Sequence, residues 1–405
     1  MRAPSRRPRR RIGVLIPLLA LAAGLPFAVT PAAHAAHAAQ VAHTAQVVDL
    51  RLAPTETAVP DSWIVVLADG STSAADLGVT PRHTYRSALH GFSSTLSKAE
   101  ATVLAADPRV AYVEQNQRVR LNATQRDATW GPDRIDQRDL PLSTTYTYRT
   151  TASNVNAYII DTGIRTSHSE FGGRAVVGTD TVGGGQNGQD CQGHGTHVAG
   201  TVGGKTYGVA KAARLIAVRV LDCDGSGTTA GVIAGVDWVT ANAVKPAVAN
   251  MSLGGGANTS LDSAVKRSIA SGVSYAIAAG NGNILGLPEN ACGTSPARVP
   301  EAITVGATDS ADRRAFFSNY GTCVDLFAPG VRVTSAWRTG DTATNTLSGT
   351  SMAAPHAAGV AALYLSEHPA ASPARVRDAL VDNATSGTVR NALPGSPDKL
   401  LHSLF

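Results

Sequence analysis

The sequence is poor in several features that mark particular classes of protein. Of its 405 residues only 16% are charged and 5% are aromatic, and only four are cysteines. Its basic residues are also unevenly placed. Residues 1–122 hold 13 Lys and Arg against 8 Asp and Glu, whereas residues 123–405 hold 22 of each. A nucleic-acid partner needs a basic surface on the folded domain, so we expect none.

Long apolar runs are equally scarce, and the one at residues 12–29 follows a cluster of arginines. Small-residue Ala-His-Ala sites come next, which completes the pattern of a signal peptide. The alternative is a membrane anchor, but Pro17 and Pro26 interrupt the run. We therefore predict a signal peptide at 1–38, a secreted protein, and no membrane attachment after cleavage.

The N-terminal third then predicts a linker and a small module. Residues 39–60 are rich in Ala, Thr and Pro, as linkers are, and residues 61–122 show the pattern of a small α+β domain. Its helix begins at Ser97, with Glu100 three residues later as the partner in a capping box. The expected elements are strands at 63–67, 90–96 and 110–114 and a helix from Ser97 to about Ala106. A generic small α+β domain remains the alternative to a specialised one.

From residue 130 onward, apolar strands alternate with helices, which is typical of an α/β fold with a mostly parallel sheet. The expected strands are 156–160, 214–221, 247–253, 274–279 and 302–307, and the expected helices are 196–202, 230–242, 260–271 and 351–367. Polar loops follow the carboxyl ends of the strands, where such a sheet places its functional site.

Three residues in these loops have the chemistry of nucleophilic catalysis. Ser351 opens a helix, where free backbone N–H groups favour developing negative charge. A serine hydroxyl needs a base, which His194 at the start of another helix can be. Asp161 ends a buried strand and can orient the histidine. The order Asp, His, Ser along the chain is that of the subtilisin triad.

Other interpretations of these residues are weaker. Cys191, His194 and His197 have the spacing of zinc ligands, but no second cysteine pair stands nearby. A lipase of the α/β-hydrolase kind would have Gly-x-Ser-x-Gly and a histidine after the serine, whereas Ala353 stands two residues after Ser351. An inactive protease that serves as a binding module is disfavoured, because all three catalytic side chains are present.

Three motifs resemble the signatures of the subtilase family: Asp-Thr-Gly at 161–163, His-Gly-Thr-His-Val-Ala-Gly at 194–200 and Gly-Thr-Ser-Met-Ala-Ala-Pro at 349–355. Segments 130–137, 249–256 and 317–321 are most similar to the proteinase K branch, and within it to aqualysin. The resemblance implies a subtilisin-like three-layer α/β fold with a mostly parallel central sheet at 123–405. It implies that residues 61–122 are an inhibitor-type propeptide of ferredoxin-like fold, cut off by the enzyme itself near Ala123.

The same resemblance implies a secreted serine endopeptidase, expected as a monomer, which acts on proteins and peptides and needs no catalytic cofactor. Its propeptide would be an intramolecular inhibitor and folding aid. Asn281 matches the side-chain donor of the family's oxyanion hole. The residues expected to bind substrate are Gly225, Ser226, Gly227, Ser252, Leu253, Gly254, Ala279 and Gly280. The first pocket among them has no charged residue, which predicts apolar or aromatic side chains there and broad tolerance.

Four cysteines allow three pairings, and the resemblance to aqualysin implies Cys191–Cys223 and Cys292–Cys323. It also implies one or two structural calcium ions, held by oxygen ligands that suit this metal. The first set is the backbone carbonyls of Pro296 and Arg298 with the carboxylate of Asp325, and the second is Asp133, Asp136 and Gln137. The alternative is that the acids are solvated or paired with Arg134 and Arg138.

One segment departs from the aqualysin pattern. Residues 282–289, between Asn281 and Cys292, form a longer stretch than that pattern has. The stretch begins beside the expected oxyanion donor. We therefore expect a changed specificity, either in the first pocket or on the leaving-group side of the substrate.

Overall fold

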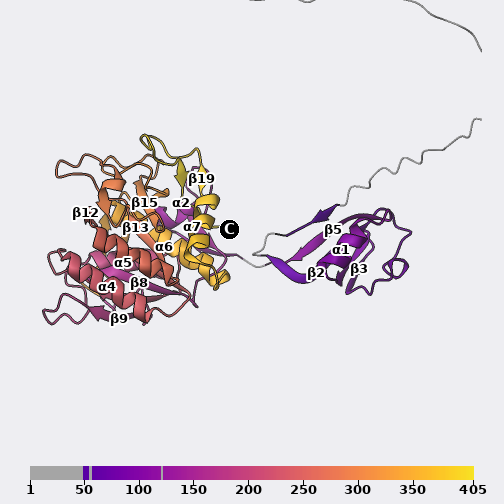
Figure 1. Ribbon diagram of the computed structural model, residues 1–405, viewed down its shortest axis with the longest axis horizontal. Coiled ribbons are helices and arrows are strands. Elements are labelled where there is room, and N and C mark those ends of the chain that lie inside the picture. The colour runs from indigo at the N-terminus through magenta and orange to yellow at the C-terminus, as the bar shows by residue number, and fades with distance from the viewer. Residues whose placement is uncertain (1–48, 54–56, 120–121) are drawn as a thin grey trace, which may run out of the picture.

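The computed structural model describes residues 49–53, 57–119 and 122–405. The expected signal peptide at 1–38 lies outside the described residues, as does much of the expected linker. Figure 1 shows a small region in indigo, built from residues 49–119, and a large region built from residues 122–405.

The small region is a five-stranded sheet with one helix packed on it. Its strands lie in the order β1 (Leu50–Arg51), β5 (Val110–Gln117), β2 (Ala58–Leu67), β4 (Gly91–Thr95) and β3 (His83–Tyr85). Helix α1 (Lys98–Ala105) starts with the predicted capping box: Glu100 N–H donates to Ser97 Oγ, and Ser97 N–H donates to the Glu100 carboxylate. Leu104 of α1 belongs to the same buried core as Trp63 and Phe92.

One boundary differs from the expectation. Strand β1 and the first residues of β2 lie within residues 39–60, which the sequence analysis expected to be a linker. Leu50 pairs with Val113 of β5, so this short strand extends the sheet at its edge. Propensity did not indicate it, because a two-residue strand is held by its tertiary partner and not by its own sequence.

The large region is built on a nine-stranded sheet that is parallel except where β19 meets β20. The strands lie in the order β19 (Thr385–Ser386), β20 (Lys399–Leu400), β16 (Leu326–Pro329), β15 (Ile303–Thr308), β13 (Ser274–Ala278), β11 (Ala247–Met251), β8 (Asn156–Asp161), β10 (Arg214–Arg219) and β9 (Ala175–Asp180). The five predicted strands are all present, and the predicted mostly parallel sheet is confirmed.

Helices cover both faces of this sheet and make the predicted three layers (Figure 1). Helices α3 (His194–Gly203), α6 (Thr350–Glu367) and α7 (Pro373–Asn383) share one apolar core with one face. Helices α4 (Thr229–Asn242) and α5 (Thr259–Ala270) share a second core with the other face. Helix α6 is buried almost all round, which explains why its apolar residues form a continuous run and not a stripe.

The remaining elements of the two regions are short. They are β6 (Ala123–Arg126), α2 (Trp130–Ile135), β7 (Thr145–Tyr148), β12 (Gly255–Gly256), β14 (Thr294–Ser295), β17 (Val333–Ala336), β18 (Thr344–Leu347) and the 3-10 turns Ala75–Leu77 and Ala291–Gly293. Within the part of the chain that the structure describes, no helix has both the length and the apolar character needed to cross a membrane.

Candidate active site

The carboxylate and the imidazole expected to work together are in direct contact. Asp161 is the last residue of β8 and is fully buried, and His194 is the first residue of α3. His194 Nδ1–H donates to Asp161 Oδ1 at 2.8 Å and to Oδ2 at 3.0 Å. The Thr162 N–H also donates to Asp161 Oδ1, at 2.8 Å. The carboxylate therefore fixes which ring nitrogen carries the proton and leaves Nε2 for the substrate side.

The approach of α3 to β8 depends on a missing side chain. A Cβ on Gly195 would lie 2.1 Å from the carbonyl oxygen of Gly163, which is far inside van der Waals contact. Only glycine lets the two backbones come this close. This is the physical reason for glycine in the turn that carries His194.

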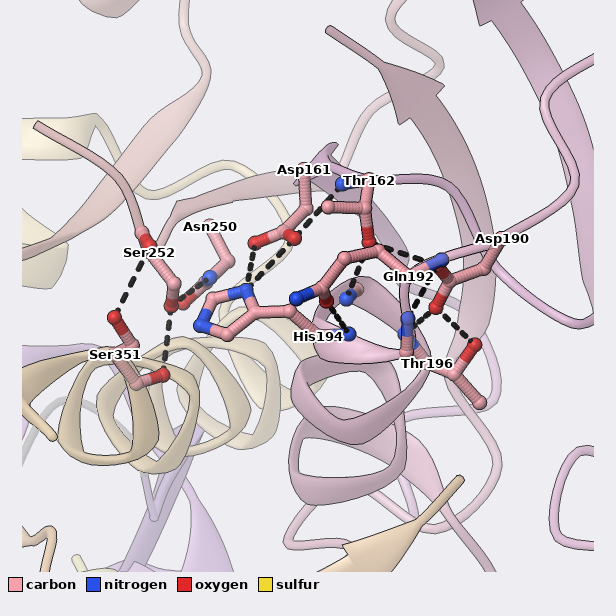
Figure 2. A network of polar contacts seen from close by, with 11 residues as sticks. Asp161, Thr162, Asp190, Gln192, His194, Thr196, Asn250, Ser252 and Ser351 are labelled. Carbon is pink, nitrogen blue, oxygen red and sulfur yellow. Dashed lines mark hydrogen bonds and ion pairs between the residues drawn. The ribbon is translucent and has the colours of Figure 1, made fainter. Parts of the chain in front are cut away.

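A second carboxylate, Asp190, holds the start of α3 and was not among the residues predicted from the sequence. Its Oδ1 accepts from Thr162 Oγ1 at 2.9 Å and from the Gly193 N–H at 2.7 Å, and its Oδ2 accepts from Thr196 N–H and Oγ1 at 2.9 and 2.6 Å. Figure 2 shows this carboxylate on the far side of His194 from Ser351. The sequence held one indication of this role. Asp190 stands just before a helix that has no Ser, Asp or Asn as its own N-cap, and an acidic residue at that place can accept from the free N–H groups of the first turn.

The pKa of His194 reflects both carboxylates. Burial has the largest single effect and lowers the pKa, but the charge of Asp161, its hydrogen bond and the charge of Asp190 together raise the pKa above the usual 6.5. The protonated imidazole is therefore favoured by its surroundings. This is the form that a general base reaches after it accepts a proton.

Ser351 lies in the first turn of α6, and Ser252 contacts it twice (Figure 2). Ser351 Oγ donates to the Ser252 carbonyl oxygen at 3.1 Å, and Ser252 Oγ donates to the Ser351 carbonyl oxygen at 2.8 Å. Asn250 Nδ2 donates to Ser252 Oγ at 2.8 Å and so orients that hydroxyl. Among the described residues, no hydrogen bond joins Ser351 Oγ to His194, although the ring of His194 points toward both serines in Figure 2. Long or misdirected catalytic hydrogen bonds are common without a substrate.

Pro355 explains why Ser252 makes the second contact. In a regular helix the N–H of residue 355 would donate to the carbonyl of residue 351, but proline has no N–H. The Ser351 carbonyl oxygen is therefore left without its helical partner, and Ser252 Oγ supplies the missing hydrogen bond. The proline in the motif thus couples Ser351 to the segment after β11.

Asn281 follows β13 and is held by the residue before Ser351. Its Oδ1 accepts from the Thr350 N–H at 2.8 Å and from Thr350 Oγ1 at 2.9 Å. Because Oδ1 is used in this way, the Nδ2 donors remain for a ligand. Thr350 Oγ1 in turn accepts from the Gly280 N–H at 3.1 Å, so the amide is fixed relative to the sheet.

A cleft runs past these residues. One part of it is lined by His194, by residues 225–229 and by residues 252–256. Both predicted substrate-binding stretches, 225–227 and 252–254, therefore face the same hollow as the imidazole. Gly225 has φ +79°, a conformation that favours glycine, and it exposes backbone there.

The first pocket lies beside Ser351 and differs from the prediction in two ways. It is lined by Ser351, Asn281, Gly280 and residues 252–256, but also by Glu289. The expectation that this pocket has no charged residue is wrong, because the stretch after Asn281 returns to the pocket and Glu289 lines it. Ala279 is fully buried in the core and does not line the pocket; its neighbours Ala278 and Gly280 do.

The structure pairs the cysteines as the resemblance implies, Cys191 with Cys223 and Cys292 with Cys323. The first bond joins the turn before His194 to the loop before Gly225. Since Cys191 is in this disulfide, the zinc interpretation fails. His197, another residue of that disfavoured zinc alternative, is fully buried and donates from Nε2 to the Val333 carbonyl at 3.0 Å.

The two sets of expected calcium ligands differ in how well they fit a cation. Asp325 Oδ2 accepts from the Thr304 N–H, and Oδ1 accepts from Arg377 Nη2 at 2.5 Å. The Pro296 carbonyl, one of the two backbone carbonyls expected in this set, accepts from the Val299 N–H. The guanidinium of Arg377 already neutralises the Asp325 carboxylate, so this set does not fit a calcium ion in the arrangement described.

The second set fits better. Asp136 Oδ1 is buried and has no hydrogen-bond partner, while Oδ2 accepts from the Thr147 N–H. Burial, the largest effect, and the nearby charge of Asp133 raise the pKa of Asp136 to about 6. Asp133 itself accepts from Ser143 and Thr144, and Gln137 Nε2 donates to the Pro141 carbonyl. A buried carboxylate oxygen without a partner, near a second carboxylate, is what a cation would satisfy. Within the described ranges, no group of three or more His, Cys, Asp or Glu is placed so that it could hold a metal ion.

Comparison with known proteins adds independent findings. A family model described as "Subtilase family" matches residues 153–398, and one described as "Peptidase inhibitor I9" matches residues 32–122. The chain is 58% identical over 321 residues to an extracellular serine proteinase of Thermus sp. (strain Rt41A), which covers 79% of this chain and 77% of the relative. It is 48% identical over 379 residues to alkaline serine exoprotease A of Vibrio alginolyticus, which covers 88% of this chain and 70% of the relative.

A solved structure agrees with these relatives. The crystal structure of a cold adapted subtilisin-like serine proteinase matches with a TM-score of 0.66 and 55% sequence identity. The match covers 69% of this chain and 99% of that chain.

Proposed function

The chain belongs to the subtilase family of serine proteases, and on that premise we propose that it is a secreted endopeptidase with the triad Asp161, His194 and Ser351. The observation that supports the triad most directly is the pair of hydrogen bonds from His194 Nδ1 to Asp161, in the same cleft as Ser351. The name of the Thermus relative supports an extracellular location.

The chemistry follows from the positions of these atoms. Ser351 Oγ turns from the Ser252 carbonyl to His194 Nε2, gives up its proton there and attacks the scissile carbonyl. The Ser351 backbone N–H and Asn281 Nδ2 donate to the oxyanion that forms. His194 then passes the proton to the leaving amine, and water hydrolyses the acyl-enzyme by the same steps. Asp161 stabilises the imidazolium each time it forms.

The cleft suggests how a substrate is held. An extended peptide fits between residues 225–227 and 252–254, where exposed backbone groups can pair with it as with an added strand. The first pocket favours apolar and aromatic side chains. Glu289 at its edge adds a weaker acceptance of basic ones, because its carboxylate is exposed to solvent.

We further propose that the protein is made as a self-processing precursor. Residues 1–38 are removed as a signal peptide, and residues 39–60 connect it to the small module. Residues 61–122 inhibit the enzyme and assist its folding. Residues 123–405 remain as a monomeric peptidase with neither a nucleic-acid partner nor a membrane attachment. The I9 match supports the inhibitory role, although it and strand β1 both begin before residue 61. Strand β6 begins at Ala123, where the cut is proposed.

A structural calcium ion completes the proposal. We assign it to Asp133, Asp136 and Gln137, because Asp136 Oδ1 is buried without a partner. When bound, calcium supplies positive charge that neutralises the two carboxylates, and it takes no part in the peptide chemistry. Binding to the folded chain alone would stabilise it by mass action.

The test of the catalytic proposal is Ser351→Ala. We expect this variant to lose casein hydrolysis and fluorophosphonate labelling and to accumulate as an unprocessed precursor, because both cleavages need the same nucleophile. Ser260→Ala, a substitution of an exposed serine on α5, is the matched control and should mature normally. A Ser351→Ala protein that still matures and digests casein would refute the assignment, and preference for a long-chain ester over casein would favour an esterase.

A further inference from the structure

The loop after Asn281 exposes an unusual amount of apolar surface. Ile284 is fully exposed, Leu285 is 77% exposed and Leu287 is 58% exposed. Phe316, from a different part of the chain, is 75% exposed and lies beside the loop, since a Cβ on Gly286 would be 3.9 Å from the Phe316 ring. We call these four side chains the apolar ridge. They are half of the eight exposed large apolar side chains of residues 122–405, and such grouping marks an interaction surface.

The loop that carries the ridge is held in one conformation. Asn283 Oδ1 accepts from the N–H groups of Leu285 and Leu287, at 2.9 and 3.2 Å. Both ends of the loop are held by one buried amide: Asn319 Oδ1 accepts from the Gly282 N–H at 3.0 Å and from the Glu289 N–H at 2.8 Å. The apolar side chains are therefore presented to solvent by a fixed turn. A preorganised surface binds a partner with little further loss of entropy.

Phe316 is fixed as well. Its ring packs edge-on against Phe317, with ring centroids 5.3 Å apart. The backbone carbonyls of Ala315 and Phe316 accept from Nη1 of Arg314, whose side chain is mostly buried. The ridge is thus rigid on both of its sides.

The loop that carries the ridge reaches the catalytic cleft at both of its ends. Gly282 and Glu289, at the two ends of the loop, line the first pocket together with Ser351, whereas residues 283–288 do not. Phe316 lines a separate hollow with Phe317, Val331 and Ser348. Ser348 stands just before the Gly349–Ser351 turn. The ridge therefore borders the nucleophile but lies outside the first pocket.

One side of Ser351 is already assigned to the acyl part of the substrate. Residues 225–229 and 252–256 line a hollow with His194, and in the proposed function they hold the acyl part of the substrate. A peptide that crosses Ser351 must continue on the remaining side, past Ser348 and Phe316. We propose that the apolar ridge binds apolar side chains on the leaving-group side of a polypeptide substrate, an inference that rests on the proposed function.

The test compares substrates that differ only after the cleaved bond. One internally quenched peptide carries Leu-Leu on the leaving-group side, a second carries Ser-Ser, and a p-nitroanilide with the same acyl part has no residues there. The variant is Ile284→Ser with Leu285→Ser and Leu287→Ser, and Phe316→Ser is made separately. The matched control is Val244→Ser, which removes a side chain 63% exposed just beyond α4.

For each ridge variant we expect kcat/KM on the Leu-Leu peptide to fall about five- to tenfold, as the loss of partial burial of one apolar side chain predicts. Values for the Ser-Ser peptide, the anilide and the Val244→Ser control should stay as in the unmodified enzyme. Equal losses on the Leu-Leu and Ser-Ser peptides would overturn the proposal, and so would a loss on the anilide, which would indicate disturbance of Asn281.

Two other occupants of the ridge give different results. A dimer that the triple substitution dissociates, seen in sedimentation equilibrium, would assign the ridge to a second copy and overturn the proposal. Binding to phosphatidylcholine vesicles that the substitution abolishes would assign it to a lipid surface, with the same consequence. Hydrolysis of the anilide separates the proposed triad from the proposed role of the ridge. It needs the triad but not the ridge, so it would continue even if the ridge bound no substrate. A chain that hydrolyses none of the substrates would overturn both.

Discussion

At the scale of single residues, His194 connects activity with pH. Its pKa is raised above 6.5, so the neutral form that can accept the proton of Ser351 is lost as the pH falls through a value above 6.5. The same shift stabilises the folded state below pH 6.5, and this contribution is lost as the pH rises through the raised pKa. Conditions that activate the base thus remove part of the stability that its partners provide.

We therefore expect the acid limb of kcat/KM to lie above pH 6.5 for the unmodified enzyme. Asp190→Asn should move this limb to lower pH, because one of the charges that raise the pKa of His194 is removed. The pH profile of anilide hydrolysis gives the position of the acid limb for the unmodified enzyme and for the variant. Identical profiles for the variant and the unmodified enzyme would contradict the role given to Asp190.

At the same scale, Glu289 should influence how well the first pocket accepts a lysine side chain. Glu289→Gln should lower kcat/KM about two- to fivefold for substrates with lysine in the first pocket, as loss of an exposed ion pair predicts, and leave phenylalanine substrates unchanged. Salt at 1 M should shrink the difference, because exposed charges are screened. Anilides with lysine or phenylalanine before the cleaved bond provide the measurement. No change for lysine at low salt would show that the carboxylate does not reach the substrate.

At the scale of elements, the first turn of α6 depends on a neighbour outside the helix. Pro355 removes the helical partner of the Ser351 carbonyl, and Ser252 Oγ replaces it at 2.8 Å. Ser252→Ala should leave that carbonyl unpaired and cost about 1–3 kcal/mol of unfolding free energy, with a lower kcat since the same turn carries the nucleophile. Ser252→Thr keeps a hydroxyl and should recover most of both. Denaturant unfolding and anilide kinetics together test this, and an alanine variant of unchanged stability and kcat would rule out the coupling.

At the scale of the whole molecule, calcium should contribute to thermal stability through Asp136. Chelation by EDTA should lower the unfolding temperature of the unmodified enzyme, and Asp136→Asn should remove the response to calcium, because the buried Oδ1 is the atom without a partner. Asp325→Asn is the control and should keep the response, since Asp325 is paired with Arg377. Calorimetry with and without EDTA provides the measurement. A full calcium response in Asp136→Asn would place the ion elsewhere.

Much of this protein was determined by its sequence alone. The five predicted strands and four predicted helices of the large region, and the capping box at Ser97, follow from apolar periodicity and local hydrogen bonding, which act between residues close along the chain. Strands β9 and β16 and helix α7 of the same region were not predicted. Glycines and small residues at the element ends placed Asp161, His194 and Ser351 as candidates. The resemblance of their motifs then implied the fold and the cysteine pairing, and the structure has both.

What only the tertiary structure decided depends on contacts between distant segments. Strand β1 exists because β5 lies beside it, and Asp325 is neutralised by Arg377, 52 residues further on. Glu289 enters the first pocket because Asn319 holds both ends of its loop. Hydrophobic periodicity predicts which side of a helix or strand is buried. It does not predict which charged or apolar side chain of a loop will line the cleft. That choice is made by packing and hydrogen bonds between segments far apart in sequence, and here it determines the environment of Ser351.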